Sequence, residues 1–366
     1  MSTKKTILVA PLNWGLGHST RCIPIINMLL EANYQPIIAS DGAALELLKL
    51  EFPDLEYLEL PSYNITYPKN GKDLKFKLLK NSPQVLRAIH GEKKMVKNLV
   101  RNRQIDGIIS DNRMGVHNKK VPSVIITHQL QVLSGNTTWL STKLHQHFIK
   151  KFDECWVPDV KNGFRLSGKM SRIKNLLIPT KYLGVLSRFN RLDCKVIYSL
   201  LVLLSGPEPQ RSILENKLLR QLISYKGKVL FIRGVVEPQQ SIVKKGHITI
   251  VNFLESKALE EALNRSTMVL SRSGYTTILD LAILNKKAFF IPTPGQFEQE
   301  YLAERLAKKG ITPYSTQEKF SVDMLEKVND YSGFQGYTPT NNIASLFDLF
   351  ERKGKLTADT KLTFNI

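Results

Sequence analysis

The sequence predicts an α/β protein of two units, each a parallel sheet covered by helices on both faces. Strand-like and helix-like segments alternate along most of the chain, and the alternation starts again near residue 195. Most predicted strands are continuous apolar runs, which is typical of strands buried on both faces. At 366 residues, the chain is also longer than one typical core, so two domains are expected.

The first domain is expected over residues 1–185. Its predicted strands cover residues 6–10, 35–40, 55–60, 107–110, 123–127 and 154–158. Helices are predicted at 19–30 and 43–50, because apolar residues recur there at helical spacing. Pro24 lies inside the first of these helices. The first turn is therefore expected to be irregular, or the regular part to begin near Ile23.

The second domain is expected over residues 186–340. Its predicted strands cover residues 196–204, 228–233, 247–251, 268–270 and 288–292, with a helix at 212–224 and helices between most of the later strands. Residues 341–366 are expected to form a last helix, at about 342–352, and a tail. This segment is expected to pack back on the first domain.

The net charge of +20 requires a partner or a structural reason. Much of it lies between residues 69 and 120, at Lys72, Lys75, Lys77, Lys80, Arg87, Lys93, Lys94, Lys97, Arg101 and Arg103. Two interpretations stay open: ordinary solvated helices, and a basic amphipathic segment on an anionic membrane surface. Nucleic acid is not expected as a partner, because no recognised binding motif or run of exposed aromatic residues accompanies the charge.

Cysteine usage and hydropathy point to a cytoplasmic protein. Cys22, Cys155 and Cys194 are widely spaced and form no metal-binding pattern, so reduced thiols and no metal site are expected. The longest apolar run, residues 196–204, is far shorter than the ~20 residues that span a bilayer. The apolar run near the start is too short for a secretory leader.

Two glycine-rich segments carry the main functional signal. Gly15, Gly17 and His18 follow the first predicted strand, and Gly274 follows the strand at 268–270. In both places a helix begins after small residues. A helix start presents unpaired N–H groups and the positive end of a dipole, which bind phosphate readily. One such site in each half predicts a cleft enzyme acting on a phosphorylated, nucleotide-linked substrate.

Three residues after strands are candidates for acid–base chemistry. His18 is a candidate general base because its ordinary pKa suits proton transfer near neutrality, although a histidine at a helix start can also have a structural or diphosphate-contacting role. Asp111 follows the strand at 107–110 and is either a second candidate base or a turn cap. His128 reads equally as a substrate contact or a core histidine. The other histidines, at 90, 117, 145, 147 and 247, are expected at the surface.

Beyond Gly274, the sequence Tyr-Thr-Thr-Ile-Leu-Asp-Leu-Ala continues, followed by Phe290-Ile291-Pro292 and by the segment 296–301. This region resembles the C-terminal domain of family 28 glycosyltransferases. The Gly-x-Gly-His-x-x-Arg sequence at 15–21 resembles the N-terminal loop of an uncharacterised bacterial and archaeal branch of that family. The resemblance implies the GT-B fold, in which two Rossmann-like domains face each other across a cleft. It places the acceptor mainly in the first domain and the nucleotide-sugar in the second.

The resemblance also assigns substrate-binding residues. It places the donor diphosphate on the backbone of Ser273, Gly274, Tyr275, Thr276 and Thr277, and the ribose hydroxyls on Asp280. It places Gln299 and Glu300 on the donor sugar, with Gln296 in the same segment. The other implied contacts are Arg188 near the phosphates, Gly206 in the loop after the strand at 196–204, and Leu254 at the uracil. In the first domain, Gly15 and Gly17 match the family's N-terminal glycine-rich loop, and His128 and Gln129 match an element that faces the cleft.

The function implied is an inverting, metal-independent transfer of a sugar from a UDP-sugar, with N-acetylglucosamine a candidate sugar. The acceptor implied is a glycan or lipid-linked molecule at a membrane surface, which would place the protein peripherally on the inner face of the cell membrane. No cofactor is expected. The alternatives are a UDP-sugar 2-epimerase of the same fold, and a non-catalytic protein that binds a nucleotide-sugar or nucleic acid.

Overall fold

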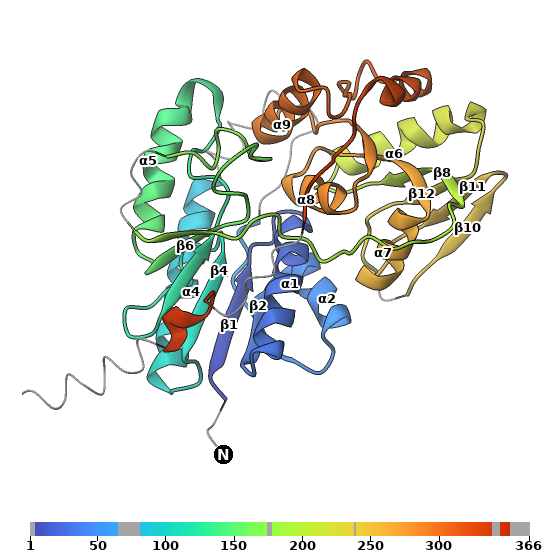
Figure 1. Cartoon of the computed structure of the whole chain (residues 1–366). Coiled ribbons are helices and arrows are strands. Elements are labelled where there is room, and N and C mark those ends of the chain that lie inside the picture. Colours follow the sequence, from blue (N-terminus) through green and yellow to red (C-terminus); the bar gives the residue numbers. More distant parts are fainter. Residues whose placement is uncertain (1–3, 65–80, 174–177, 238, 339–344, 352–366) are drawn as a thin grey trace, which may run out of the picture.

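The computed structural model describes residues 4–64, 81–173, 178–237, 239–338 and 345–351. It shows two lobes side by side, each built around one sheet (Figure 1). Within these ranges, no helix is both long enough and apolar enough to cross a bilayer. Lys72, Lys75, Lys77 and Lys80 of the basic stretch lie outside the described residues.

The N-terminal lobe has a seven-stranded sheet in the order β3-β2-β1-β4-β5-β6-β7, with all neighbours parallel. Its strands are β1 (Thr6–Pro11), β2 (Gln35–Ser40), β3 (Glu56–Glu59), β4 (Gly107–Asp111), β5 (Ser123–Ile126), β6 (Glu154–Val157) and β7 (Thr180–Tyr182). Its helices are α1 (Gly17–Glu31), α2 (Gly42–Glu51), α4 (Ser82–Arg101), the short η2 (Gly135–Thr137) and α5 (Thr138–Ile149). The strand order from β3 to β6 is that of a Rossmann sheet.

The first strand shows why these strands are apolar throughout. Ile7 and Val9 pack with α1 and α2 on one face of the sheet, whereas Leu8 and Ala10 pack with α4 on the other. Side chains alternate between the faces of a strand, so a strand covered on both sides needs apolar residues at every position.

The C-terminal lobe has a six-stranded sheet in the order β10-β11-β9-β8-β12-β13. Its strands are β8 (Tyr198–Leu203), β9 (Val229–Ile232), β10 (Ile242–Lys245), β11 (Ile248–Val251), β12 (Ser266–Ser271) and β13 (Lys287–Phe290). Its helices are α6 (Gln210–Gln221), η3 (Leu222–Ser224), α7 (Ser256–Asn264), α8 (Tyr275–Ile283), α9 (Phe297–Lys308) and η4 (Val322–Asp330). All pairs are parallel except β10 with β11. The five parallel strands again have the Rossmann order, so the α/β GT-B class predicted from sequence is confirmed.

Three local features differ from what the sequence predicted. Helix α1 is regular from Gly17 and runs through Pro24, because the loss of one N–H donor is offset by burial of Ile23, Ile25 and Ile26 around it. Strands β7 and β10 were not predicted. The first has only three residues, and all four residues of the second are exposed at a sheet edge, so neither has an apolar core pattern.

The end of the chain packs on the N-terminal lobe. Phe347 and Phe350 join the apolar cluster of β1, α1 and Trp156, and the Phe350 ring lies against Gly107, where a Cβ atom would be 2.5 Å from it. Described helical residues here cover only 348–351, which is shorter than the helix predicted at 342–352. These contacts close one face of the first sheet with residues from the far end of the sequence.

We expect Phe350→Ala to lower the free energy of unfolding of the N-terminal lobe by about 3 kcal/mol, the lower end of the range for truncating a buried phenylalanine. Urea unfolding followed by far-UV circular dichroism measures this. Ile223→Ala is the control, because Ile223 is 73% exposed and should change stability little. Equal effects of the two variants would show that the terminal segment does not stabilise the lobe.

Candidate functional site

A cavity of about 620 Å³ lies between the lobes, at the carboxyl ends of both parallel sheets. Open α/β sheets bind ligands at this edge. The sequence-predicted residues that line it are Gly15, Gly17, His18, His128, Gln129, Arg188, Gly206, Leu254, Gly274, Tyr275, Thr276, Thr277, Asp280, Gln296 and Gln299. Asp111, Ser273 and Glu300 do not line it. The cavity thus brings together most residues singled out in both halves of the sequence.

The two glycine-rich segments touch each other. The Thr276 hydroxyl, at the start of α8, donates a hydrogen bond to the carbonyl oxygen of Gly17, at the start of α1, over 2.9 Å. A Cβ atom on Gly17 would lie 3.2 Å from the Thr276 Oγ1, so a side chain there would press on the other lobe. Gly15 has a φ of 71°, which favours glycine. The N-terminal turns of α1 and α8 therefore meet beside the cavity.

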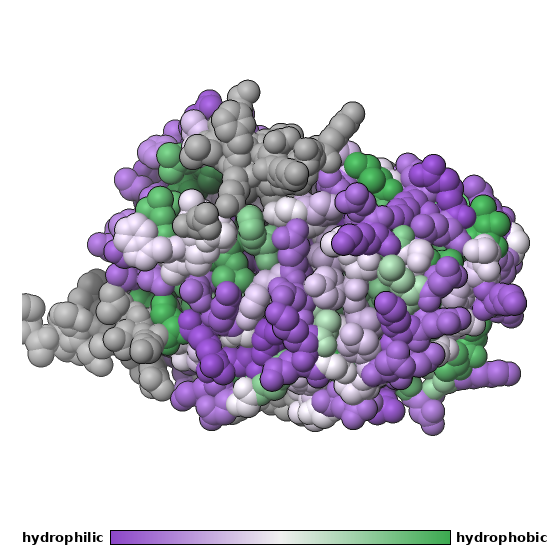
Figure 2. Space-filling model, turned by 90° about the horizontal axis from the view of Figure 1, so that it is seen from above, coloured by the Kyte–Doolittle hydropathy of each residue, from purple (hydrophilic) through white to green (hydrophobic). Residues whose placement is uncertain are grey.

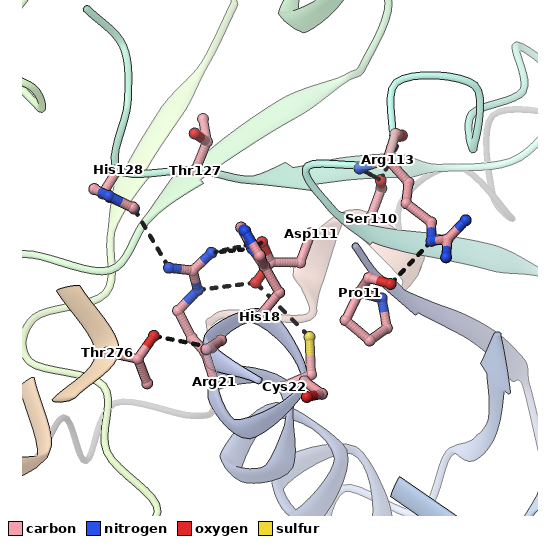
Figure 3. A network of polar contacts seen from close by, with 12 residues as sticks. Pro11, His18, Arg21, Cys22, Ser110, Asp111, Arg113, Thr127, His128 and Thr276 are labelled. Carbon is pink, nitrogen blue, oxygen red and sulfur yellow. Dashed lines mark hydrogen bonds and ion pairs between the residues drawn. The ribbon is translucent and has the colours of Figure 1, made fainter. Parts of the chain in front are cut away.

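His18 and Asp111 form a hydrogen-bonded pair at the end of β4 and the start of α1 (Figure 3). The His18 Nδ1 lies 2.7 Å from the Asp111 Oδ1. The same Nδ1 also lies 3.0 Å from the Arg21 Nη2. With its proton on Nδ1, directed at the carboxylate, a neutral ring keeps its lone pair on Nε2. His18 lines the cavity. A buried carboxylate therefore orients the His18 ring at the edge of the cavity.

Arg21 is a site residue that the predictions from sequence did not include. Its guanidinium contacts both carboxylate oxygens of Asp111, at 2.8 Å from Nε and 2.5 Å from Nη2 (Figure 3). Burial opposes the charge on Asp111, but Arg21 and His18 outweigh it and lower the pKa of this carboxyl to about 2. Asp111 is therefore ionised at neutral pH. The signal was present in the sequence, because Arg21 lies one helical turn after His18.

His128 connects the lobes through Glu298, another residue that was missed. The His128 Nε2 lies 2.9 Å from the Glu298 Oε1, and the Gln129 amide donates to the other carboxylate oxygen. On its other side, the His128 Nδ1 lies 3.3 Å from the Arg21 Nη1. A neutral ring with its proton on Nε2 satisfies both contacts. The ring also stacks on Tyr275, with centroids 4.0 Å apart.

The surroundings of His128 and Glu298 shift the pKa values of both side chains. Burial lowers the pKa of His128, and Glu298 offsets this only in part. Burial alone would raise the pKa of Glu298, but His128, His18 and Arg21 lower it below its usual value. The Glu298 carboxylate, from α9, contacts His128 and Gln129 of the N-terminal lobe. Continuous contacts run from Asp111 through Arg21 and His128 to Glu298.

The start of α9 differs from the arrangement expected from sequence. The polar residues that line the cavity here are Gln296, Glu298 and Gln299, whereas the Glu300 carboxylate accepts the Gly295 N–H over 2.9 Å. Successive side chains on a helix point about 100° apart. The pair that faces the cavity is therefore Glu298 and Gln299, one residue earlier than the expected pair of Gln299 and Glu300. Gln299 also has a structural role, since its Oε1 accepts the Thr293 N–H over 2.8 Å.

Two residues expected at the diphosphate, Ser273 and Tyr275, use their hydroxyl groups in hydrogen bonds within the protein. The Ser273 hydroxyl donates to the Gln299 carbonyl over 2.8 Å, and the Tyr275 hydroxyl donates to the Pro158 carbonyl over 2.6 Å. These side chains fix α8 against α9 and against the N-terminal lobe. The first turn of α8 nevertheless retains N–H groups that have no acceptor within the helix.

Arg188 and Asp280, which the sequence assigned to different parts of the donor, lie close enough for their charges to interact. The Ser187 hydroxyl donates to the Asp280 Oδ1 over 2.6 Å, and Arg188 Nη1 donates to the Ser256 hydroxyl over 2.8 Å. Glu51, from α2 of the other lobe, accepts from the Ser256 N–H over 2.8 Å at the start of α7. Burial raises the pKa of Asp280 to about 6, although Arg188 and Ser187 oppose the shift.

The N-terminal lobe contributes an apolar wall to the cavity. Its apolar lining residues include Leu12, Trp14, Val85, Ile89, Met114, Leu144 and Phe148, from the β1–α1 loop, α4, the segment after β4, and α5. His145, which was expected at the surface, also lines this wall, and burial with nearby His128 lowers its pKa to about 4. Among the described residues, no group of three or more metal-ligating side chains is placed to hold a metal ion.

Comparison with known proteins agrees with this geometry. Residues 210–334 match the family described as the glycosyltransferase family 28 C-terminal domain. These residues form a family 28 glycosyltransferase domain. They include α8 and α9, the two helices whose N-terminal turns line the cavity of this glycosyltransferase.

Similar proteins extend over both lobes of the glycosyltransferase. A UDP-N-acetylglucosamine--N-acetylmuramyl-(pentapeptide) pyrophosphoryl-undecaprenol N-acetylglucosamine transferase of Gloeothece citriformis is 23% identical over 289 residues, which is 75% of this chain and 74% of that protein. The enzyme of the same name from Haemophilus ducreyi is 24% identical over 208 residues, 55% of each protein. The crystal structure of MurG from Acinetobacter baumannii matches 96% of this chain and 100% of its own, with a TM-score of 0.55 and 14% identity. A likeness of this kind supports the GT-B fold.

The raised pKa of Asp280 gives a pH-dependent prediction. Between about pH 4 and 6 the folded protein retains a proton on Asp280 that the unfolded chain has lost, so the stability due to this group falls as pH rises through that range. Asp280→Asn removes the decline. We expect the melting temperature of the variant, relative to wild type, to rise between pH 4 and 7 without nucleotide.

Asp323→Asn, at an exposed carboxylate, is the control for that measurement and should follow wild type at each pH. Parallel curves for wild type and Asp280→Asn would contradict the assigned burial effect.

Proposed function

We propose that this glycosyltransferase transfers a sugar from a UDP-sugar, with N-acetylglucosamine the candidate sugar, to a lipid-linked or other membrane-surface acceptor. The proposed reaction is inverting and needs no metal. The activity named for the relatives supports this donor and acceptor class. The structural observation that carries the proposal is the meeting of the α1 and α8 N-terminal turns beside the His18–Asp111 pair in one cavity.

The proposed donor site lies on the C-terminal lobe. The diphosphate binds the N–H groups at the start of α8, where the helix dipole favours negative charge. Asp280 accepts hydrogen bonds from the ribose, and the backbone near Leu254 contacts the uracil. Glu298 and Gln299 replace the pair Gln299 and Glu300 at the donor sugar, because Glu298 lines the cavity and Glu300 does not.

The chemistry requires a base and a stabilised leaving group. His18 Nε2 removes the proton from the acceptor hydroxyl, and the acceptor oxygen attacks the anomeric carbon. The bond from that carbon to the diphosphate oxygen breaks, and UDP leaves with the electron pair. Attack on the face opposite the leaving group inverts the anomeric centre. Asp111 keeps His18 in the required tautomer and stabilises the imidazolium that forms, while α8 stabilises the charge on UDP.

The proposed acceptor side is the apolar wall of the N-terminal lobe, which suits a lipid-linked molecule. Close to that wall, α5 exposes Trp139 (66%) and Leu140 (59%), with the Lys143 ammonium over the Trp139 ring. Seen from above, hydrophobic patches lie among hydrophilic surface on both lobes (Figure 2). Apolar side chains flanked by lysine favour peripheral binding to an anionic membrane.

The proposal is tested by UDP binding and by transfer. UDP at a hundredfold excess over its Kd should stabilise the protein by about 2.7 kcal/mol in thermal unfolding. UDP should be released from UDP-N-acetylglucosamine only when a polyprenyl-diphosphate sugar acceptor is present. His18→Ala should lower the rate about 10²–10⁴-fold, the usual contribution of a general base, and bind UDP nearly as well as wild type.

Asp111→Asn should lose activity as well, because the amide no longer fixes the tautomer of His18. Conversion of UDP-N-acetylglucosamine to its 2-epimer without acceptor would instead support the epimerase alternative. No stabilisation by UDP or any other nucleotide would overturn both enzyme interpretations.

A membrane-docking role of α5 predicts that Trp139→Ser combined with Leu140→Ser weakens binding to phosphatidylglycerol vesicles by about tenfold or more, since each buried apolar side chain contributes about 1.5–3 kcal/mol. UDP affinity should not change. Ile242→Ser with Val243→Ser removes comparable exposed apolar surface from β10 and is the matched control. Sedimentation with vesicles measures both, and equal binding by all three proteins would refute docking through α5.

A further inference from the structure

Three described arginines are at most 2% exposed: Arg21, Arg113 and Arg272. Arg21 pairs with Asp111, and Arg113 pairs with Asp41 and Glu92. Arg272 forms no ion pair with any carboxylate among the described residues. An arginine buried without a counter-charge is costly, so its position requires a reason.

Arg272 lies at the end of β12, directly before the loop at 273–274. Its Nη1 donates to the carbonyl oxygens of Ile291 and Pro292, each at 3.1 Å, after β13. Its Nη2 donates to the Gln210 carbonyl at 2.9 Å, at the start of α6, and to the Gln317 side-chain oxygen at 2.6 Å. One guanidinium therefore holds together three segments that continue into the cavity-lining loops at 205–207, 274–277 and 295–299.

All of these acceptors are neutral, so they satisfy hydrogen bonds without cancelling the positive charge. Burial lowers the pKa of Arg272 to about 9, which still leaves the group cationic at neutral pH. Charge interactions are stronger in a low-dielectric interior than in water. An uncompensated positive charge behind the loop at 273–277 favours an anion at its surface, where the proposed site binds a diphosphate.

The corresponding arginine of the N-terminal lobe shows the contrast. Arg113 also joins strand ends, because its Nε donates to the Pro11 carbonyl at 2.9 Å and its Nη1 to the Pro61 carbonyl at 3.2 Å. Its charge, however, is balanced by Asp41 and Glu92. Both lobes use a buried arginine to join their loops, but among the residues that the structure describes the arginine of the C-terminal lobe has no counter-ion.

We propose that Arg272 is a positioning residue that also attracts the donor diphosphate electrostatically from behind the loop at 273–277, without contacting it. This inference rests on the proposed function, since it needs a nucleoside diphosphate at the start of α8. According to this proposal, the site prefers a charged donor to an uncharged nucleoside partly because of Arg272, a residue that lies outside the cavity.

The test compares Kd values for UDP and uridine in wild type, Arg272→Met and Arg272→Lys by isothermal titration calorimetry. Methionine removes the charge, whereas lysine retains it with fewer hydrogen bonds. Arg272→Met should weaken UDP binding about tenfold or more, equivalent to about 1.4 kcal/mol, and change uridine binding less than about threefold. Arg272→Lys should keep UDP affinity within about threefold of wild type.

If Arg272→Met does not fold, Arg272→Gln serves in its place, because its amide can still donate to the carbonyls while lacking charge. Arg113→Lys is the control in the other lobe and should leave the ratio of the two Kd values unchanged. Equal weakening of UDP and uridine by the neutral variant would overturn the electrostatic role and leave a structural one. If wild type binds uridine but gains nothing from the diphosphate, the proposed donor site itself is wrong.

Discussion

The contact between the N-terminal turns of α1 and α8 is the constraint on which the rest of the site depends. Gly17 and Thr276 meet directly, so the carboxyl ends of the two sheets face each other over a short distance. A Cβ atom at position 17 would lie 3.2 Å from the Thr276 Oγ1, so glycine allows the two turns to approach closely. The contact also places His18, the next residue, at the boundary of the lobes. Two positive helix ends next to one cavity make it suited to an anionic substrate.

Charge organises the space around that contact. Asp111 fixes Arg21 and His18, and Arg21 in turn contacts His128, whose other nitrogen lies against Glu298 of the second lobe. Each buried charge in this series has a partner, which keeps the cost of burying it low. The series also couples the lobes, because any change in their separation must alter the contact between His128 and Glu298.

The two lobes share a sheet order but differ in what they present to the cavity. The N-terminal lobe adds an apolar wall to the His18–Asp111 pair, while the C-terminal lobe presents a helix start backed by the uncompensated charge of Arg272. An apolar wall suits part of an acceptor that avoids water, and a positive helix end suits a diphosphate. This difference between the lobes comes from the loops that follow the strands and not from the sheets themselves.

The sequence by itself determined the two α/β units and the places where their strands end in functional loops, because apolar runs and glycine turns are local signals. His18 and Asp111 could be found in this way. Tertiary structure alone decided that Glu298 and not Glu300 faces the cavity, that Arg21 joins Asp111 to His128, and that Phe350 closes the first lobe. These facts depend on helix rotation and on contacts between residues far apart in the chain, which local patterns do not encode.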